Sequence, residues 1–507
     1  MAYNSKDDFD QTVSLALKTI TEGKQALVFA SSKLSAEKTA EEISLEISGG
    51  ERLSELRKDI LSVGSTPTTQ CKKLANCVEK GIAFHHAGLL AGQRELIEEN
   101  FRSGKIKVIC ATPTLAMGVS TPAFRVIVKS LKRYNDKRGM MDWISNMECH
   151  QMMGRAGRPE FNESGEAILV ASSEHEEERI KERYIYGEIE PVQSKLAVEP
   201  VFRMHLLSLI STGNIASQEG AEKFFAQTLW AQQFGDMAEV NVMITRMLGL
   251  LEEYGMILRK KEIFGATYLG RRVAELYLDP TTANSLVQRM KKAAKMLDTG
   301  KINEFSFLQA FSYTFEMEPL LRVKKKEEEE IWDKLMEQYN SLLEAEPEEI
   351  YLRDFFMNSI KTALFFNEWI QEKDEEYLLE KYDIRPGEIR AKLEKAEWLL
   401  YAGEELSKAL QLNELVSVFS RLRVRVKYGI KDELVPLVKV RGVGRVRARK
   451  LFNNGVKDLG DLRLMEKGWL AKILGKETAE EVKSQVGGEI ETVRENKRKG
   501  QINLNDF

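Results

Sequence analysis

The chain has 507 residues, 43% of them hydrophobic and 30% charged, which is the balance of a soluble, folded protein with several domains of roughly 100–200 residues each. Lysine and arginine (75) nearly balance aspartate and glutamate (78), so any nucleic-acid binding requires local basic patches. Neither an apolar run of about 18 residues nor a secretion signal is present, and we expect a cytoplasmic protein. The four cysteines lack the spacing of metal ligands, so no metal site is predicted.

The first part of the chain alternates apolar strands with helices. Strands are predicted at 25–31, 81–88, 107–113, 126–131 and 166–172. Because strands separated by helices form parallel sheets that helices cover on both faces, we predict an α/β domain. Ser31, Ser32 and Thr112 stand at the C-terminal ends of two of these strands and would lie at the carboxyl edge of the sheet, where open α/β folds bind ligands.

The loop ATPTLAMGVSTPA at 111–123 follows one of these strands. The hydroxyl of Thr112 and the backbone around Gly118 are suited to hold a sugar–phosphate backbone without reading bases. The alternative is an ordinary strand-to-helix loop. Downstream, residues 130–145 predict two short strands around a turn at 135–139.

The segment QMMGRAGRP at 151–159 is the most specific motif. Arg155 and Arg158, three residues apart, can point together at a polyphosphate, because the guanidinium fork binds phosphate oxygens bidentately and keeps its charge. The small residues Gly154 and Gly157 let backbone segments approach closely. A basic helix start with solvated arginines is the alternative, and the strand-rich context upstream favours a nucleotide-dependent motor.

Helices dominate the rest of the chain. Residues 188–280 predict three helices and a β-hairpin with its turn at 260–262, the element order of a winged helix. Residues 281–425 are predicted to be all helix, with the charge run 324–330 as a solvated face. Residues 426–500 contain a Gly-Val-Gly turn of helix-hairpin-helix composition, and 501–507 form a polar tail.

Together with LVFASS (27–32) and FHHAGL (84–89), these motifs stand in the order found in the second RecA-like domain of Ski-like superfamily 2 helicases. Nearly the whole chain resembles the archaeal DNA helicases of that group, which are related to the helicase region of DNA polymerase theta. The resemblance implies five parts: a RecA-like domain at 1–187, a winged helix at 188–280, a helical ratchet domain at 281–425, a helix-hairpin-helix-like domain at 426–500 and a flexible tail at 501–507.

The resemblance also implies residue roles around ATP. Gln151, Arg155 and Arg158 would face ATP across a cleft between two motor domains, with Arg158 as the arginine finger. The nucleotide-side backbone positions would be Gly118, Gly154 and Gly157. On the DNA side, Ser31, Ser32 and Thr112 would contact the backbone of one strand.

Further DNA contacts follow from the same resemblance. The hairpin at 130–145 would wedge the duplex apart, with Tyr134 and Trp143 on the last base pair; a surface hairpin packed on a neighbouring domain is the alternative. Arg390 and Trp398 would stack on successive bases of one strand, although Trp398 is equally suited to a core. The arginines behind the Gly-Val-Gly turn would grip phosphates unless the hairpin of helices is purely structural. They are Arg445, Arg447 and Arg449.

Neither the phosphate-binding G-x-x-x-x-G-K-[ST] loop nor a D-E-x-H box occurs in the sequence. We therefore expect ATP and Mg2+ to be bound mainly by a first RecA-like domain outside it, on a longer protein or on another product of a split gene. This chain alone should bind DNA without hydrolysing ATP. The implied whole is a monomeric 3′→5′ helicase acting on single-stranded and forked DNA in replication-fork repair and recombination. The alternatives are an RNA helicase of the same group and a non-catalytic DNA-binding adaptor.

The tail carries one further pattern. Gln501, Leu504 and Phe507 follow the spacing Q-x-x-L-x-x-F, which resembles the peptide that docks on sliding clamps. One helical turn would place the two apolar residues together as anchors, with the glutamine at the rim of a pocket. A chance match of a short polar tail is the alternative.

Overall fold

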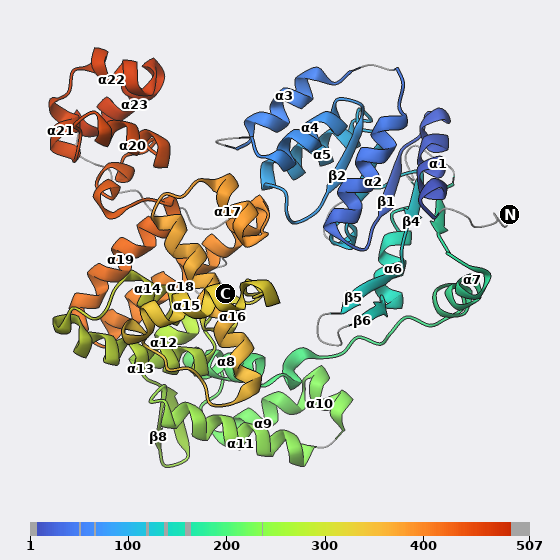
Figure 1. Cartoon of the computed structure of the whole chain (residues 1–507). Coiled ribbons are helices and arrows are strands. Elements are labelled where there is room, and N and C mark those ends of the chain that lie inside the picture. Colours follow the sequence, from blue (N-terminus) through green and yellow to red (C-terminus); the bar gives the residue numbers. More distant parts are fainter. Residues whose placement is uncertain are drawn as a thin grey trace. The chain divides into compact units, whose positions relative to one another are not determined.

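A computed structural model of the chain describes residues 8–49, 52–64, 67–117, 121–135, 140–157, 164–235 and 237–487. The chain forms two compact units (Figure 1). The first comprises residues 1–193 together with 384–391, and the second comprises 194–383 and 392–507.

A five-stranded parallel sheet lies at the centre of the first unit. Its strands, in spatial order, are β2 (Ile82–His85), β3 (Val108–Ala111), β1 (Ala26–Phe29), β4 (Arg125–Val128) and β7 (Glu166–Leu169). Every residue of β1 to β4 is buried, which requires cover on both faces of the sheet. The predicted α/β domain with a parallel sheet is therefore confirmed.

Helices pack around this sheet and connect its strands (Figure 1). They are α1 (Asp8–Thr21), α2 (Lys33–Glu46), α3 (Ser54–Ser62), α4 (Thr69–Val78), α5 (Ala91–Arg102), α6 (Asn146–Met153) and α7 (Glu174–Ile180). Side-chain oxygens of Thr68 and Ser173 accept hydrogen bonds from the first turns of α4 and α7, which is why these helices begin there. The buried Arg125 ties the sheet to α1 through Thr19 (2.6 Å) and Glu22 (3.3 Å).

An antiparallel hairpin projects from this unit. Its strands are β5 (Lys132–Asn135) and β6 (Met140–Trp143), with Lys132 opposite Trp143. The two strands predicted within 130–145 are confirmed, and the turn between them lies outside the described residues.

The second unit begins with α8 (Glu199–Ser211), α9 (Gln218–Ala226), α10 (Leu229–Phe234) and α11 (Met237–Glu253). The hairpin of β8 (Ile257–Lys260) and β9 (Ile263–Ala266) follows. The hairpin is confirmed, but four helices precede it where three were predicted. Thr228 caps the amide of Ala231 and starts a separate short helix, which divides the expected second helix.

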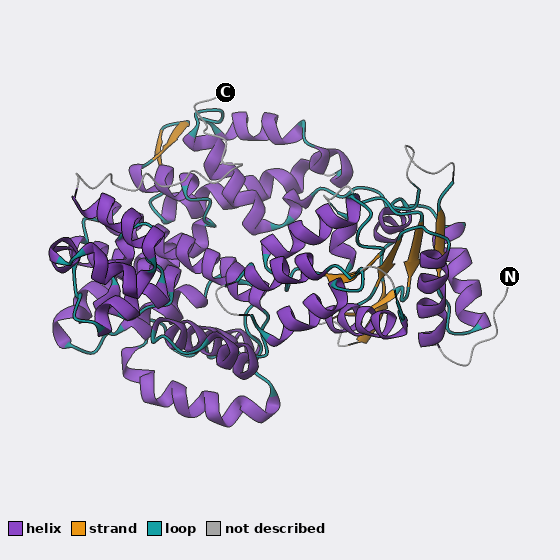
Figure 2. Ribbon diagram, turned by 90° about the horizontal axis from the view of Figure 1, so that it is seen from above, coloured by secondary structure: helices purple, strands orange, loops and turns teal. Residues whose placement is uncertain are grey.

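The remainder is helical, as predicted, and helices predominate in Figure 2. They are α12 (Tyr268–Glu275), α13 (Pro280–Met296), α14 (Glu304–Ser312), α15 (Glu328–Gln338), α16 (Ile350–Ile370), α17 (Glu375–Tyr382), α18 (Pro386–Ala409) and α19 (Asn413–Tyr428). Helix α18 begins in the first unit and continues in the second. Among the described helices, none is both long and apolar enough to cross a membrane.

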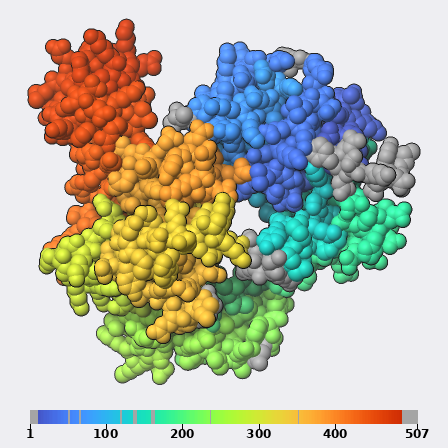
Figure 3. Space-filling model, in the orientation of Figure 1, coloured from blue at the N-terminus to red at the C-terminus, as the bar shows by residue number. Residues whose placement is uncertain are grey.

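The C-terminal helices surround a small apolar core of their own. They are α20 (Arg445–Asn453), α21 (Leu459–Leu464), α22 (Lys467–Leu474) and α23 (Lys476–Gly487). Their buried core includes Leu451, Leu462 and Leu470. In Figure 3 this segment, in red, forms one compact lobe.

The charge run at 324–330 is only partly the predicted solvated face. Most of its side chains are exposed, but Glu327 pairs at 2.6 Å with Lys361, whose side chain is 4% exposed. A buried ammonium group requires a nearby carboxylate, so one member of the run belongs to the interior.

Candidate nucleotide and nucleic-acid site

The predicted DNA-backbone residues of the first unit share one edge of the sheet. Ser31 and Ser32 follow β1 and Thr112 follows β3, and these strands are neighbours with Phe29 opposite Ala111. Ser32 accepts a hydrogen bond from the Ser35 amide (3.1 Å) and so also caps α2. The sequence placed these three residues together correctly, and their contact with DNA stays a prediction.

The motif QMMGRAGRP is joined directly to the loop after β3. The Nε of Arg155 donates to the carbonyl of Ala116 (3.1 Å), at the end of a short 3-10 helix, η1 (Pro113–Ala116). The amide of Ala123 donates to the carbonyl of Arg155 (3.0 Å), and the amide of Gly157 donates to the carbonyl of Ala123 (2.7 Å). The motif therefore holds Ala116 and Ala123, on either side of the predicted nucleotide-side position Gly118.

Two positions of this motif favour glycine, for different structural reasons. Gly157 has φ +97°, a conformation that L side chains rarely adopt. Gly154 ends α6 with ordinary helical angles, and a Cβ there would lie 3.2 Å from the His150 carbonyl oxygen. A Cβ on Gly165 would come within 2.2 Å of the Gly157 nitrogen, so close backbone packing also requires Gly165, which the sequence analysis missed.

Helix α6 presents Gln151 to solvent and is held at its start by a distant carboxylate. Glu190 accepts hydrogen bonds from the amides of Asn146 (2.6 Å) and Met147 (2.9 Å). These bonds lower the pKa of the Glu190 carboxyl. A negative charge at a helix N-terminus is also stabilised by the helix dipole. No local sequence signal marks Glu190 for this role, because its partners precede it by more than 40 residues.

Several predicted site residues lie outside the described part of the chain. These are Gly118, Arg158, Gln501, Leu504 and Phe507. Their roles stay predictions.

The hairpin β5–β6 has an open apolar end and a fixed base. Tyr134, Met140 and Met141 are each more than half exposed. Trp143 instead is half-buried, with its ring 6.1 Å from that of Tyr184 and the Lys132 ammonium 4.5 Å over its face. In this structure Trp143 anchors the hairpin, so Tyr134 is the better placed of the two predicted wedge residues.

Helix α18 carries the next two predicted DNA contacts. Arg390 is exposed and makes no ion pair with any residue in the described ranges. Trp398 is half-buried, and its Nε1 donates to the carbonyl of Leu276 (3.0 Å). One edge of the indole is thus fixed by the protein, as the core alternative requires, while part of its surface remains open.

The three arginines behind the Gly-Val-Gly turn are not equivalent. Arg449 forms a bidentate pair with Glu372 (2.8 and 2.5 Å). Arg445 lies over the Trp369 ring, 5.2 Å from its centre. Burial lowers the pKa of Arg445. Arg447 is exposed and donates to the nearby Gly442 carbonyl (2.7 Å). Of the three, Arg447 is the one that faces solvent, and contact with DNA stays a prediction for all three.

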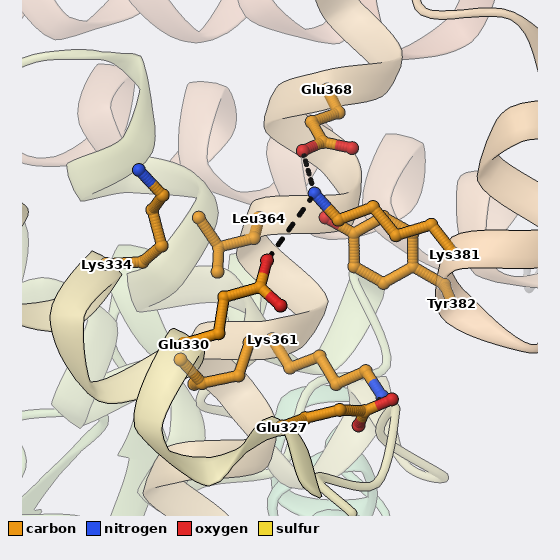
Figure 4. Close-up of a pocket in the computed structure, with 9 residues that line it drawn as sticks. Glu327, Glu330, Lys334, Lys361, Leu364, Glu368, Lys381 and Tyr382 are labelled. Carbon is orange, nitrogen blue, oxygen red and sulfur yellow. Dashed lines mark hydrogen bonds and ion pairs between the residues drawn. The ribbon is translucent and has the colours of Figure 1, made fainter.

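A pocket of about 50 Å3 in the second unit does not extend these sites (Figure 4). Three glutamates and three lysines line it, together with Ile331, Leu364 and Tyr382. Lys361 pairs with Glu327 and Lys381 pairs with Glu368, each at 2.6 Å. Because its charges compensate each other, the pocket offers no net attraction for a polyphosphate.

Comparison with known families assigns a class to this arrangement. The helicase conserved C-terminal domain matches residues 51–160, which include the loop after β3 and the whole of QMMGRAGRP. The family described as archaeal helicase, domain 4, matches residues 305–429, from α14 to the end of α19. The chain is thus a helicase protein with an α/β motor domain and an archaeal helical domain.

Three relatives, each named ATP-dependent DNA helicase Hel308, match along most of the chain. The Pyrococcus horikoshii protein is 37% identical over 98% of this chain and 68% of its own length. The Pyrococcus abyssi protein is 36% identical over 99% of this chain and 68% of its own length. The Methanococcus vannielii protein is 34% identical over 88% of this chain and 64% of its own length. The chain belongs to the Hel308 family of archaeal DNA helicases and spans about two-thirds of the length of these relatives.

A solved structure of the DUF1998 helicase MrfA, bound to DNA and AMPPNP, shares 17% identity with this chain at a TM-score of 0.34. The matched region covers 52% of this chain and 30% of the MrfA chain. A likeness of this size supports no argument about fold or ligand.

Proposed function

We propose that this chain supplies the second motor domain and the DNA-tracking domains of an ATP-dependent 3′→5′ helicase that opens forked DNA in replication-fork repair. The observation that carries the proposal is the bonding of Arg155 to Ala116, which links the phosphate-facing motif to the loop at the DNA-facing sheet edge. Membership of the Hel308 family supports the choice of DNA as the substrate.

Gln151, on α6, and Arg155, just after this helix, fit a polyphosphate. Gln151 is exposed, and the Arg155 guanidinium has five N–H donors, of which those bonded to Ala116 use only part. Bound ATP would supply the free energy of phosphoryl transfer, with Mg2+ and its phosphates held mainly by a first RecA-like domain. Gln151 and Arg155 would then orient the phosphates, and Arg158 would stabilise the developing charge.

The same residues would transmit the effect of nucleotide binding to the DNA-facing edge of the sheet. When Arg155 turns toward phosphate, its bond to the Ala116 carbonyl would lengthen or shift, and the end of η1 would move with it. Thr112 lies just before η1, so this movement changes its position at the sheet edge. Tyr134 at the open end of β5–β6 would meet the duplex, and Trp398 would hold the separated strand.

The test compares the chain alone with the chain joined to a first RecA-like domain that carries an ATP-binding loop. We expect no phosphate release from the chain alone, with or without single-stranded DNA. The joined protein should hydrolyse ATP faster when DNA is added and should open a forked DNA duplex. Robust ATP hydrolysis by the chain alone would contradict the proposal. Opening of an RNA fork in preference to a DNA fork of the same sequence would instead indicate an RNA helicase.

A further inference from the structure

The first turn of α18 belongs to the first unit, although most of the helix belongs to the second unit. The guanidinium of Arg385 donates to the carboxylate of Glu37 on α2. A second ion pair joins Lys33, also on α2, to Glu388 on α18. These contacts join residues that are separated by about 350 positions in the chain.

The FHHAGL motif (84–89) contributes a buried histidine that contacts the same Glu37 carboxylate. His86 is fully buried, and its Nε2 lies 3.0 Å from the Glu37 carboxylate. The amide of Gly88 donates to the Nδ1 of His86 (3.1 Å), so the ring proton is on Nε2 and is donated to Glu37. Gln70 adds a third hydrogen bond to the same carboxylate (2.9 Å).

The charge state of this cluster is set by its surroundings. Burial lowers the pKa of His86 and outweighs the nearby carboxylate, so the ring stays neutral. Burial alone would raise the pKa of Glu37, but the hydrogen bonds from His86 and Gln70 and the charge of Arg385 bring it below its ordinary value. Glu37 is therefore a buried anion for which Arg385 is the bonded cation. Removal of one partner from a buried pair is strongly destabilising for that contact, because a charge stays behind unpaired.

Two glycines bring the backbones together at the same place. The amide of Gly387 donates to the carbonyl of Gly88 (2.9 Å). A Cβ on Gly387 would lie 2.3 Å from the Ala87 carbonyl oxygen, and a Cβ on Gly88 would lie 2.7 Å from the Cδ of Arg385. Real Cβ atoms do not approach backbone oxygen this closely. Any larger residue at Gly387 would push α18 away from the end of β2.

We propose that Arg385 is a positioning residue and that Glu37, His86, Gly88, Arg385 and Gly387 form a mechanical linkage, which rests on the function proposed above. The linkage keeps the first turn of α18 attached to the sheet edge while ATP is bound and hydrolysed. Displacement of the motor domain is thereby delivered along α18 to Arg390 and Trp398, which hold the DNA strand.

The construction of α18 suits this task. The helix runs without a break for 24 residues, a length of about 36 Å at 1.5 Å per residue. Its only proline, Pro386, stands in the first turn, where the missing N–H does not interrupt the helix. The ion pairs and glycine contacts hold this first turn against the sheet edge of the first unit.

The linkage can be tested in the protein joined to its ATP-binding domain. In Arg385→Ala and Gly387→Ala, the number of base pairs opened per ATP hydrolysed should fall about 2- to 30-fold, the range for mutations that alter coupling between sites. DNA-stimulated ATP hydrolysis per folded molecule should stay close to wild type, whereas the melting temperature of Arg385→Ala should fall, because Glu37 keeps its charge without its bonded cation. Arg385→Lys keeps a cation beside Glu37 and should recover most of the lost coupling.

Matched controls are Gly249→Ala, at a helical glycine with nothing within 4 Å of the added Cβ, and Arg102→Ala, at an exposed arginine of α5. Neither should change base pairs opened per ATP. An unchanged ratio in Gly387→Ala and Arg385→Ala, in a wild-type background that unwinds DNA, would overturn the linkage alone. Loss of ATP hydrolysis per folded molecule, in step with the loss of unwinding, would show a merely structural role and would also overturn it. Failure of the wild-type protein to unwind DNA would overturn the proposed function itself.

Discussion

At the scale of single residues, what each arginine already binds decides how readily it can meet a phosphate. Arg447 is exposed, and its partner is a nearby backbone carbonyl. Arg449 is held by the carboxylate of Glu372, so a phosphate must first displace that partner. Arg155 is intermediate, because its partner is also an uncharged carbonyl but its side chain is half-buried. A bidentate pair with a carboxylate adds a second bond and the attraction of opposite charges, which ranks Arg449 as the least available of the three.

Trp398 is the residue for which anchoring and DNA stacking can be separated. Trp398→Phe removes the hydrogen bond to Leu276 but keeps an aromatic face. We expect it to lower the free energy of unfolding by about 0.5–1.5 kcal/mol while largely preserving DNA affinity. Trp398→Ala should in addition weaken binding of single-stranded DNA by roughly 1–3 kcal/mol, because stacking on a base is lost. Fluorescence anisotropy with a labelled oligonucleotide measures the affinity, and thermal denaturation measures the stability.

The affinity must be calculated per folded molecule. If Trp398→Ala keeps wild-type affinity on that basis while losing stability, the tryptophan has a core role and does not stack on DNA.

At the scale of elements, the hairpin β5–β6 divides its residues between a base and an open end. Replacing the exposed Tyr134 and Met141 with serine should impair strand separation in the joined protein several-fold while DNA-stimulated ATP hydrolysis continues. The motor would still move along DNA but would lack the apolar surface that meets the last base pair. A gel assay of fork opening and a phosphate-release assay on the same samples make the comparison.

The exposed Leu45 on α2 provides the matched control, since Leu45→Ser removes a similar apolar surface elsewhere in the same unit. Equal loss of fork opening and ATP hydrolysis in the hairpin variant would mean that the hairpin is structural.

The base of the hairpin depends on a carboxylate whose ionisation is measurable. Glu176 lies 2.6 Å from the Lys132 ammonium, which itself lies over Trp143. Burial alone would raise the pKa of Glu176, but hydrogen bonds from Lys132 and Ser172 lower it to about 2, from an ordinary value of 4.5. The unfolded chain therefore binds this proton more readily than the folded chain between these two values. The stabilisation is complete above about pH 4.5 and is lost as the pH falls toward 2.

We accordingly expect Glu176→Gln to lower the melting temperature at neutral pH and to reduce its fall on acidification. Circular dichroism melts of wild type and variant across the range from neutral pH to about pH 3 give both quantities. Glu55→Gln, at an exposed glutamate of α3, should leave the wild-type profile unchanged. Parallel acid profiles for wild type and Glu176→Gln would remove Glu176 from this role.

At the scale of the whole molecule, the proposed DNA contacts are distributed over both compact units, and one of them follows from surface charge. Arg447 and Lys450 are exposed on α20. Replacing both with alanine should weaken DNA binding about equally for all sequences. It should also reduce the slope of log affinity against log salt by about one for each phosphate contact removed. Anisotropy titrations at several salt concentrations measure this slope.

The comparison variant is Arg421→Ala, at an arginine already paired with Asp432. Its salt slope should match wild type. A wild-type slope in the α20 double variant would show that this surface does not meet DNA.

The sequence by itself determined the class of fold and most of its elements. Apolar runs gave the strands from Ala26 to Phe29 and from Val108 to Ala111, and alternation with helices predicted that they are parallel. The motif QMMGRAGRP, read together with the loop at 111–123, indicated a helicase motor before any contact was known. These features depend on periodicity and on short motifs, which are properties of neighbouring residues.

Only the tertiary structure decided which side chains meet. Arg385 and Glu37 are separated by 348 positions, and Arg449 and Glu372 by 77. No local pattern connects such residues, because their contact depends on how whole elements pack. For the same reason Trp143 appeared suited to DNA but lies against Tyr184, and Gly165 carried no signal until its neighbour Gly157 was placed beside it. Burial and partner choice arise from the packed fold, and they decide whether a polar or aromatic side chain remains available to a ligand.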